Sequence, residues 1–342
     1  MRSACPLTFR GVVSSFCWCA RPSGSEAGWR AVTLVYEVGK GATPAVSLAG
    51  QGGRTIPQSL AARLDTLQRQ LGAALFARVA GPEGPANRAR FNTPGPRWFS
   101  PDRPIRRVHG DASMFVGGLL ALLLQSLHPR AMIAVAQHSD YRNDPWGRLQ
   151  RTSTFLAATT YGPAQDAQRA VDHVRSVHRH ITGTDPDGRP YRADDPHLLR
   201  WVHVAETDSF LRCHQRYGAQ PLDAVGCDGY VADTARIALA LGVPDPPRTQ
   251  AELAAALDDY RPELRATPDA LEAARFLVWS PPLPLLARGP YTLLAATAIA
   301  ELPLWARQEL RLPRLHGAES LLVPPAGHAI VSTIRWAMGA RR

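Results

Sequence analysis

His178 is the residue best suited, by its type and its position, to bind a metal ion or a cofactor. Apolar residues at helical spacing surround it: Ala167, Ala170, Val171, Val174, Val177 and Ile181. His178 falls on that stripe one turn after Val174, whereas His173 and His180 point away from it. A histidine that faces a protein core must satisfy two ring nitrogens there. The commoner solution is a hydrogen bond to a backbone carbonyl, and the alternative is ligation of a metal or haem iron by the neutral imidazole.

Arg148 and Thr152 lie four residues apart on a predicted helix and therefore share one of its faces. If that face points inward, the guanidinium and the hydroxyl could hold a propionate or polarise bound dioxygen. The other interpretation is a surface arginine beside an ordinary helix threonine, and spacing alone favours it.

A third group consists of His203, Glu206 and Phe210 on one face of a later predicted helix, with His214 one turn further on. The H-x-x-E spacing could give two ligands to one metal ion. A di-iron bundle requires paired E-x-x-H motifs and further glutamates, and the sequence contains no second half of such a set. A non-haem metal site is therefore the lesser alternative.

Hydrophobic periodicity predicts the helices that would position these residues. The first is an amphipathic helix over 58–79, which a Pro- and Gly-rich loop over 81–104 follows; a short strand is predicted over 32–38. Further helices are predicted over 111–125, 129–137, 145–161, 164–181, 196–214, 228–241, 250–257, 268–278, 291–310 and 330–337.

Capping residues support several of these helix ends. Asp111 is predicted to cap the helix that follows it, and Asp144 followed by Pro145 is a strong helix start. Gly162 is predicted to end that helix, and the Asp187-Gly188 pair predicts a tight turn.

The predicted fold class is all-α, with a single multi-helix globular domain behind a flexible N-terminal tail. Residues 1–55 are rich in Gly, Ser, Ala and Pro without a sustained period, so they are expected to form the tail. Residues 56–342 are expected to form the helical domain. The sequence shows no internal repeat and no alternation typical of a large sheet.

Charge and cysteine content narrow the expected partners and compartment. The net charge is +10, but the arginines are spread along the chain, so nucleic-acid binding is not expected. The five cysteines form no disulfide framework, which favours a reducing compartment and hence the cytoplasm. The apolar stretches 115–124 and 291–305 are shorter than the about 20 residues of a membrane span. A soluble protein without a membrane span is expected, and nothing in the sequence indicates an oligomeric state.

Several enzyme classes lose support because their motifs are absent. The sequence has no G-x-S-x-G elbow, no Walker-type G-x-x-x-x-G-K and no G-x-G-x-x-G after a strand. Cys213-His214 is not part of a C-x-x-C-H motif, which excludes covalent c-type haem.

Three long segments resemble the MpaB-type oxygenase family, which includes the latex-clearing rubber oxygenases. The segments are GGLLALLLQSLHPRAMIAVAQHSDYRNDPWGRLQRTSTFL, VRSVHRHITGTDPDGRPYRADDPHLLRWVHVAETDSFL and LPLWARQELRLP. Together they place the family core at about residues 100–315. The resemblance implies an all-helical domain that encloses a pocket for non-covalent haem b, and characterised members cleave isoprenoid double bonds with dioxygen.

Carried to this sequence, the resemblance implies that His178, in the V-R-S-V-H segment, is the proximal ligand of the haem iron. It also implies that Arg148 and Thr152, in G-R-L-Q-R-T, lie beside the haem and act in catalysis. One departure is that rubber-cleaving members carry a glutamate base near the haem, while residues 131–137 contain no carboxylate. The resemblance therefore favours a small lipophilic substrate over rubber.

The sequence as a whole predicts a haem b-dependent oxygenase that acts with dioxygen on a lipophilic substrate, with isoprenoids as one candidate class. Two alternatives stay open at this point. One is a non-catalytic helical protein that binds haem or a lipid, and the other is a non-haem metal oxygenase that uses His203 and Glu206.

Overall fold

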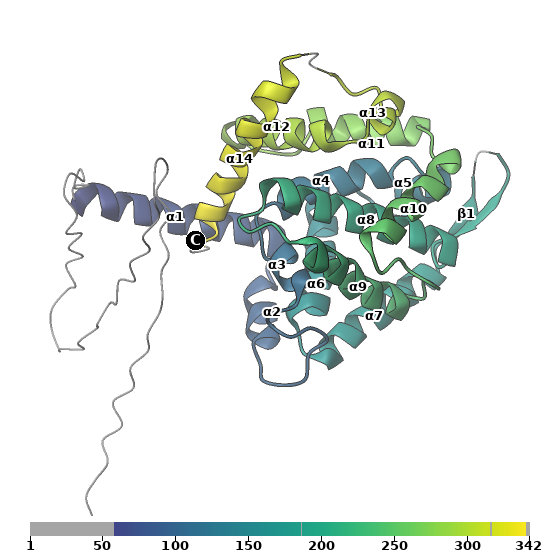
Figure 1. Ribbon diagram of the computed structural model, residues 1–342, viewed down its shortest axis with the longest axis horizontal. Helices are drawn as coiled ribbons and strands as arrows, with labels where there is room; N and C mark the ends of the chain where they lie inside the picture. Colours follow the sequence, from purple (N-terminus) through teal and green to yellow (C-terminus); the bar gives the residue numbers. More distant parts are fainter. Residues whose placement is uncertain (1–57, 186, 315–316, 340–342) are drawn as a thin grey trace, which may run out of the picture. The chain divides into compact units, whose positions relative to one another are not determined.

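The structure is a computed structural model that describes residues 58–339 except 186 and 315–316. The predicted tail and the predicted strand over 32–38 lie outside the described residues. As predicted, the fold is all-α, with one short β-hairpin and one turn of 3₁₀ helix beside the helices (Figure 1). In chain order the elements are α1 (Gln58–Ala80), α2 (Gly84–Phe91), α3 (Pro104–His109), α4 (Met114–Gln125), α5 (Pro129–His138), α6 (Pro145–Tyr161), α7 (Ala164–Arg179), β1 (Thr182–Thr184), β2 (Pro190–Arg192), α8 (Pro196–Tyr217), α9 (Ala224–Leu241), α10 (Gln250–Tyr260), η1 (Arg261–Glu263), α11 (Pro268–Trp279), α12 (Leu285–Glu301), α13 (Leu304–Glu309) and α14 (Glu319–Ala337).

Helix α6 shows how local signals fix the ends of a helix. The Asp144 carboxylate accepts a hydrogen bond of 2.8 Å from the backbone N–H of Gly147. Pro145 occupies the first helical position, where its missing N–H costs nothing, and Gly162 follows the last residue. The helix therefore begins and ends at the predicted residues.

Two predictions of local structure were wrong in part. The predicted loop over 81–104 contains the short helix α2. The predicted helix over 291–310 is two helices, α12 and α13, with Leu302 and Pro303 between them. A proline inside a helix removes a donor and clashes with the preceding turn, which accounts for the break at Pro303.

Helix α14 begins at Glu319, eleven residues before the predicted start at 330, and continues through Pro324 and Pro325. Its first residue is held from outside the helix, because the Arg307 guanidinium donates to both carboxylate oxygens of Glu319, at 2.5 and 2.6 Å. Arg307 is itself buried. This tertiary contact supports a helix start that the two prolines hide in the sequence.

Asp111 acts differently from its predicted role as an N-cap. Helix α4 begins three residues later, and the Asp111 carboxylate accepts from the backbone N–H groups of Ser113 and Ala219, at 2.8 and 3.1 Å. It also forms an ion pair of 2.9 Å with Arg335 of α14. Asp111 therefore joins three distant segments rather than capping one helix.

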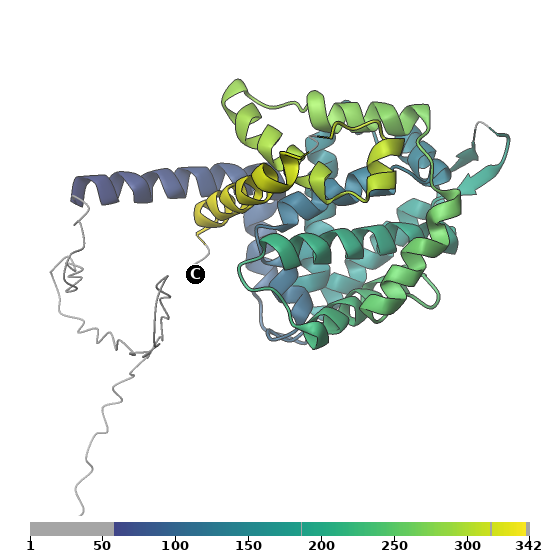
Figure 2. The ribbon, with the colours of Figure 1, turned by 45° about the horizontal axis from the view of Figure 1, so that its top comes forward.

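Helices α4 and α8 form the middle of the domain. Helices α11 to α14 lie on one side of them and α3, α6, α7 and α9 on the other (Figures 1 and 2). The leucines of α4 supply much of the buried surface, and Leu123 and Leu124 are fully enclosed. The predicted core helix over 115–124 is confirmed.

Helix α1 matches its predicted range but not its predicted burial. The stripe of leucines that predicted an amphipathic helix is largely exposed, at 41–46% for Leu60, Leu64, Leu67 and Leu71. In Figures 1 and 2 much of α1 extends beyond the other helices, which explains why this stripe has so little cover.

Within residues 58–339, no single helix combines the length and apolar character needed to cross a membrane. Helices α4 and α5 reach that length and composition only as a pair, with a bend of 107° between them.

Candidate active site

Two helical hairpins bring the predicted site residues toward one end of the domain. Helices α6 and α7 are consecutive, pack against each other and are joined at Gly162 and Pro163. Arg148 precedes that turn by 14 residues and His178 follows it by 15, so each lies about 20 Å from it at about 1.5 Å per residue. The hairpin therefore places Arg148 and His178 at the same distance from its turn, near its open end.

Helices α8 and α9 form the second hairpin. The Thr207 hydroxyl of α8 lies 3.4 Å from that of Thr234 in α9, which fixes the register of the pair. The Arg175 guanidinium of α7 donates to the backbone carbonyl of Ala240, in the last turn of α9, at 3.1 Å. The last turns of α7 and α9 therefore lie together, at the level of the first half of α8, where His203 stands.

His178 is half-buried, as is Val174 one turn before it, while Val171 is fully buried and Val177 is 44% exposed. Burial lowers the pKa of the imidazole, and the nearby Asp194 carboxylate opposes that shift. The ring has no hydrogen-bonding partner among the described residues. His178 is therefore a predominantly neutral imidazole at pH 7 whose nitrogens are not committed to the protein.

Arg148 is half-buried, and burial lowers the pKa of its guanidinium, as does the positive charge of Arg151. Its guanidinium has neither an ion pair nor a hydrogen bond within the part of the chain that the structure describes. The neighbouring Arg151 is 64% exposed and pairs with Asp144 at 3.2 Å. A desolvated cation without a counter-ion is costly, so the surroundings of Arg148 favour an anion.

Thr152 is exposed, and its hydroxyl donates to the backbone carbonyl of Arg148 at 3.1 Å. This is the ordinary bond of a threonine to its own helix. Its predicted role beside a cofactor stays a prediction, with less support than that of Arg148.

His203 and Glu206 lie on α8 and are both half-buried. Burial lowers the pKa of His203 to about 4 and raises that of Glu206 to about 7. The Nε2 atom of His203 is enclosed without a hydrogen-bonding partner. Among residues 58–339, neither side chain belongs to a group of three histidine, cysteine or carboxylate ligands close enough to share an ion. The H-x-x-E spacing therefore does not assemble a metal site in this structure.

The sequence did not indicate a polar network around His109 at the end of α3. Its Nδ1 lies 2.8 Å from the Thr160 hydroxyl and its Nε2 lies 3.3 Å from the Tyr230 hydroxyl. Burial lowers the pKa of this ring to about 3, so it is neutral. A lone histidine in a helix of six residues carries no periodic signal that could have predicted this contact.

His214 also proved structural, because its Nε2 lies 3.1 Å from the backbone carbonyl of Gln220 and the side chain is fully enclosed. Two hollows in the described surface, of about 320 and 310 Å³, lie beside Trp305 and beside Arg107. Neither is lined by Arg148, Thr152 or His178. The candidate site is therefore identified by Arg148 and His178, whose polar groups lack partners, and not by these hollows.

These two residues could hold haem, a planar group whose propionates are anionic and whose iron takes a nitrogen ligand. A neutral imidazole is the usual axial ligand of haem iron, and an unpaired guanidinium suits a propionate. Arg148 and His178 supply one of each at the same level of the α6–α7 hairpin.

The comparison with protein families gives one match. The model described as "ER-bound oxygenase mpaB/B'/Rubber oxygenase, catalytic domain" matches residues 106–336, more than half of the chain. The match extends beyond the predicted family core to the end of α14. Searches of the curated proteins and of the solved structures found no match. The chain therefore belongs to the family of MpaB and rubber-oxygenase catalytic domains, and it is an enzyme of the oxygenase class.

Proposed function

We propose that this oxygenase depends on haem b and acts with dioxygen on a small lipophilic substrate of the isoprenoid class. The observation that carries the proposal is the desolvated Arg148 guanidinium, which lacks a counter-ion and lies at the level of the uncommitted His178 imidazole. A ligand with an anionic group for Arg148 and a metal atom for His178 would satisfy both residues.

In this proposal His178 holds the iron and Arg148 holds a propionate. When bound, the haem supplies the dioxygen chemistry, and the protein supplies position and electrostatics. On the same helix, Val171 is fully buried and Val174 is half-buried, so the face that carries His178 is apolar. Thr152 lies one turn from Arg148 and would contact the same edge of the site.

Glu206 is the described carboxyl group best suited to exchange a proton in such a site. Its pKa of about 7 means that both forms are populated at neutral pH, and its carboxyl has no hydrogen bond within residues 58–339. The predicted position of a base on α5 holds apolar side chains instead, and Met132 and Ile133 are buried. Glu206 would thus hold a proton at a carboxylate oxygen when the reaction releases one.

The substrate class rests on the family. Its description names rubber oxygenases, and rubber is a polyisoprenoid hydrocarbon.

The test is a titration of the full-length, haem-free protein with haemin, followed by absorption spectroscopy. We expect a Soret band that saturates at one haem per chain. His178→Ala should change the spectrum and weaken binding by roughly tenfold or more, while the exposed His180→Ala should leave both unchanged. Arg148→Gln should weaken binding, whereas Arg151→Gln on the same helix should not.

Absence of a Soret band after reconstitution would refute the haem dependence. Dioxygen uptake with an isoprenoid hydrocarbon is the second measurement. Saturable haem binding without substrate-dependent uptake across several isoprenoids would instead support a non-catalytic haem-binding protein.

A further inference from the structure

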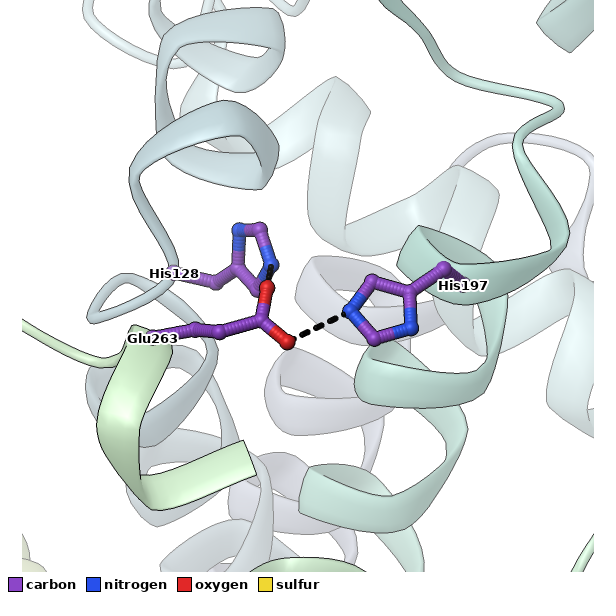
Figure 3. A group of neighbouring side chains, drawn as sticks. All are labelled: His128, His197 and Glu263. Atoms are coloured by element: carbon purple, nitrogen blue, oxygen red, sulfur yellow. Dashed lines mark hydrogen bonds and ion pairs between the residues drawn. The ribbon is translucent and has the colours of Figure 1, made fainter. Parts of the chain in front are cut away.

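Three residues that are far apart in the sequence meet at one edge of the domain (Figure 3). His128 precedes α5, His197 is the second residue of α8, and Glu263 ends η1. The Nε2 atom of His197 lies 2.8 Å from one carboxylate oxygen of Glu263, and the Nε2 atom of His128 lies 3.4 Å from the other. One ligand atom from each residue lies within 4.8 Å of the other two.

These separations agree with those around a single ion. Ligand atoms bound at about 2.1 Å to one transition metal lie roughly 3 to 3.5 Å apart in tetrahedral or octahedral geometry. The contact of 3.4 Å between His128 and Glu263 already has this spacing, and the contact of 2.8 Å between His197 and the other oxygen is slightly shorter. The two imidazoles need to approach each other, and His197, whose side chain is 45% exposed, can do so by a small rotation of its ring.

His128 is the buried member of the group. Its side chain is 2% exposed, and its Nε2 atom is enclosed without a hydrogen bond, although it points toward the Glu263 carboxylate. The nearest polar atom to Nε2 is a Glu263 oxygen at 3.4 Å, and Nδ1 accepts only a long hydrogen bond of 3.5 Å from the Ala131 backbone N–H. An ion bound at Nε2 would replace this weak arrangement, with the ring proton moving to Nδ1.

His197 has an outer contact of the kind that orients metal-bound histidines. The Tyr260 hydroxyl donates to the backbone carbonyl of His197 at 2.8 Å and lies 3.4 Å from its Nδ1 atom. That hydroxyl can accept a hydrogen bond from the Nδ1–H group, and with the proton on Nδ1 the lone pair of Nε2 is available to an ion. Tyr260 itself is fully buried, so this support is rigid.

The charges around the group are mixed. As ligands, two imidazoles and one carboxylate would contribute a net charge of −1, which suits a divalent ion. Arg130 opposes it, because its guanidinium lies 3.8 Å from the same oxygen of Glu263 that faces His128. Arg130 is 31% exposed and can turn toward solvent.

We propose that His128, His197 and Glu263 form a binding site for a divalent transition-metal ion of the Zn²⁺ type. Three protein ligands leave at least one position for water. The site differs from the proposed haem site, since His197 precedes Glu206 on α8 by nine residues, about 14 Å along the helix. A bound ion would tie the start of α5, the start of α8 and η1 together.

The experiment uses the full-length, haem-free protein after treatment with a chelator. Co²⁺ titration followed by visible spectroscopy reports ligation, and equilibrium dialysis against Zn²⁺ with elemental analysis gives the stoichiometry. We expect one ion per chain and a higher Tm with Zn²⁺, because an ion that binds only the folded state stabilises it.

His197→Ala and Glu263→Gln should each weaken binding by roughly 100-fold, and Arg130→Gln should tighten it. The exposed His173→Ala on α7 is the matched control and should bind like the wild type. His197 and Glu263 are 45% and 38% exposed, so these substitutions leave the core intact, which circular dichroism verifies.

Equal binding by the wild type, His197→Ala and Glu263→Gln would refute the site, because the ion would then sit elsewhere, for example on cysteines. Absence of binding by the wild type would refute it as well. Because haem is absent throughout, neither result bears on the proposed haem dependence.

Discussion

Replacing Glu206 by glutamine is expected to change how the stability of this protein depends on pH. The pKa of Glu206 is about 7 in the folded chain because burial disfavours the charged carboxylate, whereas an ordinary glutamate has a value of 4.5. Glutamine has nearly the same shape and cannot ionise. The substitution therefore removes the charge and retains the packing.

The direction follows from proton binding. The folded state holds the Glu206 proton more tightly than the unfolded state, so the ionised form at higher pH favours unfolding. Below about pH 4.5 the group costs nothing, between about pH 4.5 and 7 the cost grows, and above about pH 7 it is complete. One pKa unit corresponds to about 1.4 kcal/mol, so the difference between 4.5 and about 7 gives a total of about 3.5 kcal/mol.

The assay is urea unfolding of the haem-free protein, followed by circular dichroism at several values between about pH 5 and pH 8. We expect Glu206→Gln to gain about 3 kcal/mol over the wild type across this range, with most of the gain below about pH 7. Glu83→Gln, at an exposed position before α2, should track the wild type at every pH. A constant difference between Glu206→Gln and the wild type would refute the reasoning, because it would show that the carboxyl titrates normally in the folded chain.

Two further predictions concern contacts that hold the helices together. In Gly327→Ala the new methyl carbon would stand 2.7 Å from the ring of Tyr217, which is fully buried, so we expect a loss of about 1–2 kcal/mol in chemical unfolding. Gly118→Ala, in α4 with no atom within 4 Å of the new methyl group, should instead stabilise the protein slightly. Asp111→Asn should cost about 3 kcal/mol at neutral pH, because it leaves the Arg335 guanidinium largely unpaired in a buried setting. Burial alone would raise the pKa of Asp111, but hydrogen bonds from Arg335 and two backbone N–H groups lower it, so its contribution is present above the ordinary value of 3.8 and is lost as the pH falls below it. A cost that does not shrink on acidification would contradict this assignment.

The sequence by itself determined most of the helices and the family. Helix α6 is fixed by Asp144, Pro145 and Gly162, all within or beside the helix, and the apolar core helix α4 is evident from its composition. These features can be predicted from the sequence because capping and periodicity depend on residues a few positions apart. The long segments that resemble the MpaB and rubber-oxygenase family likewise gave the family that the comparison then showed.

Only the tertiary structure decided how distant residues are paired. Arg148 and Arg151 look alike in the sequence, and the structure leaves the first without a counter-ion while the second pairs with Asp144. Likewise, no spacing links His128 to His197, because each precedes or opens a different helix and they meet only when α5 and α8 pack. Burial and charge pairing depend on the packing of whole helices, and this packing sums many weak contacts that no local pattern of residues records.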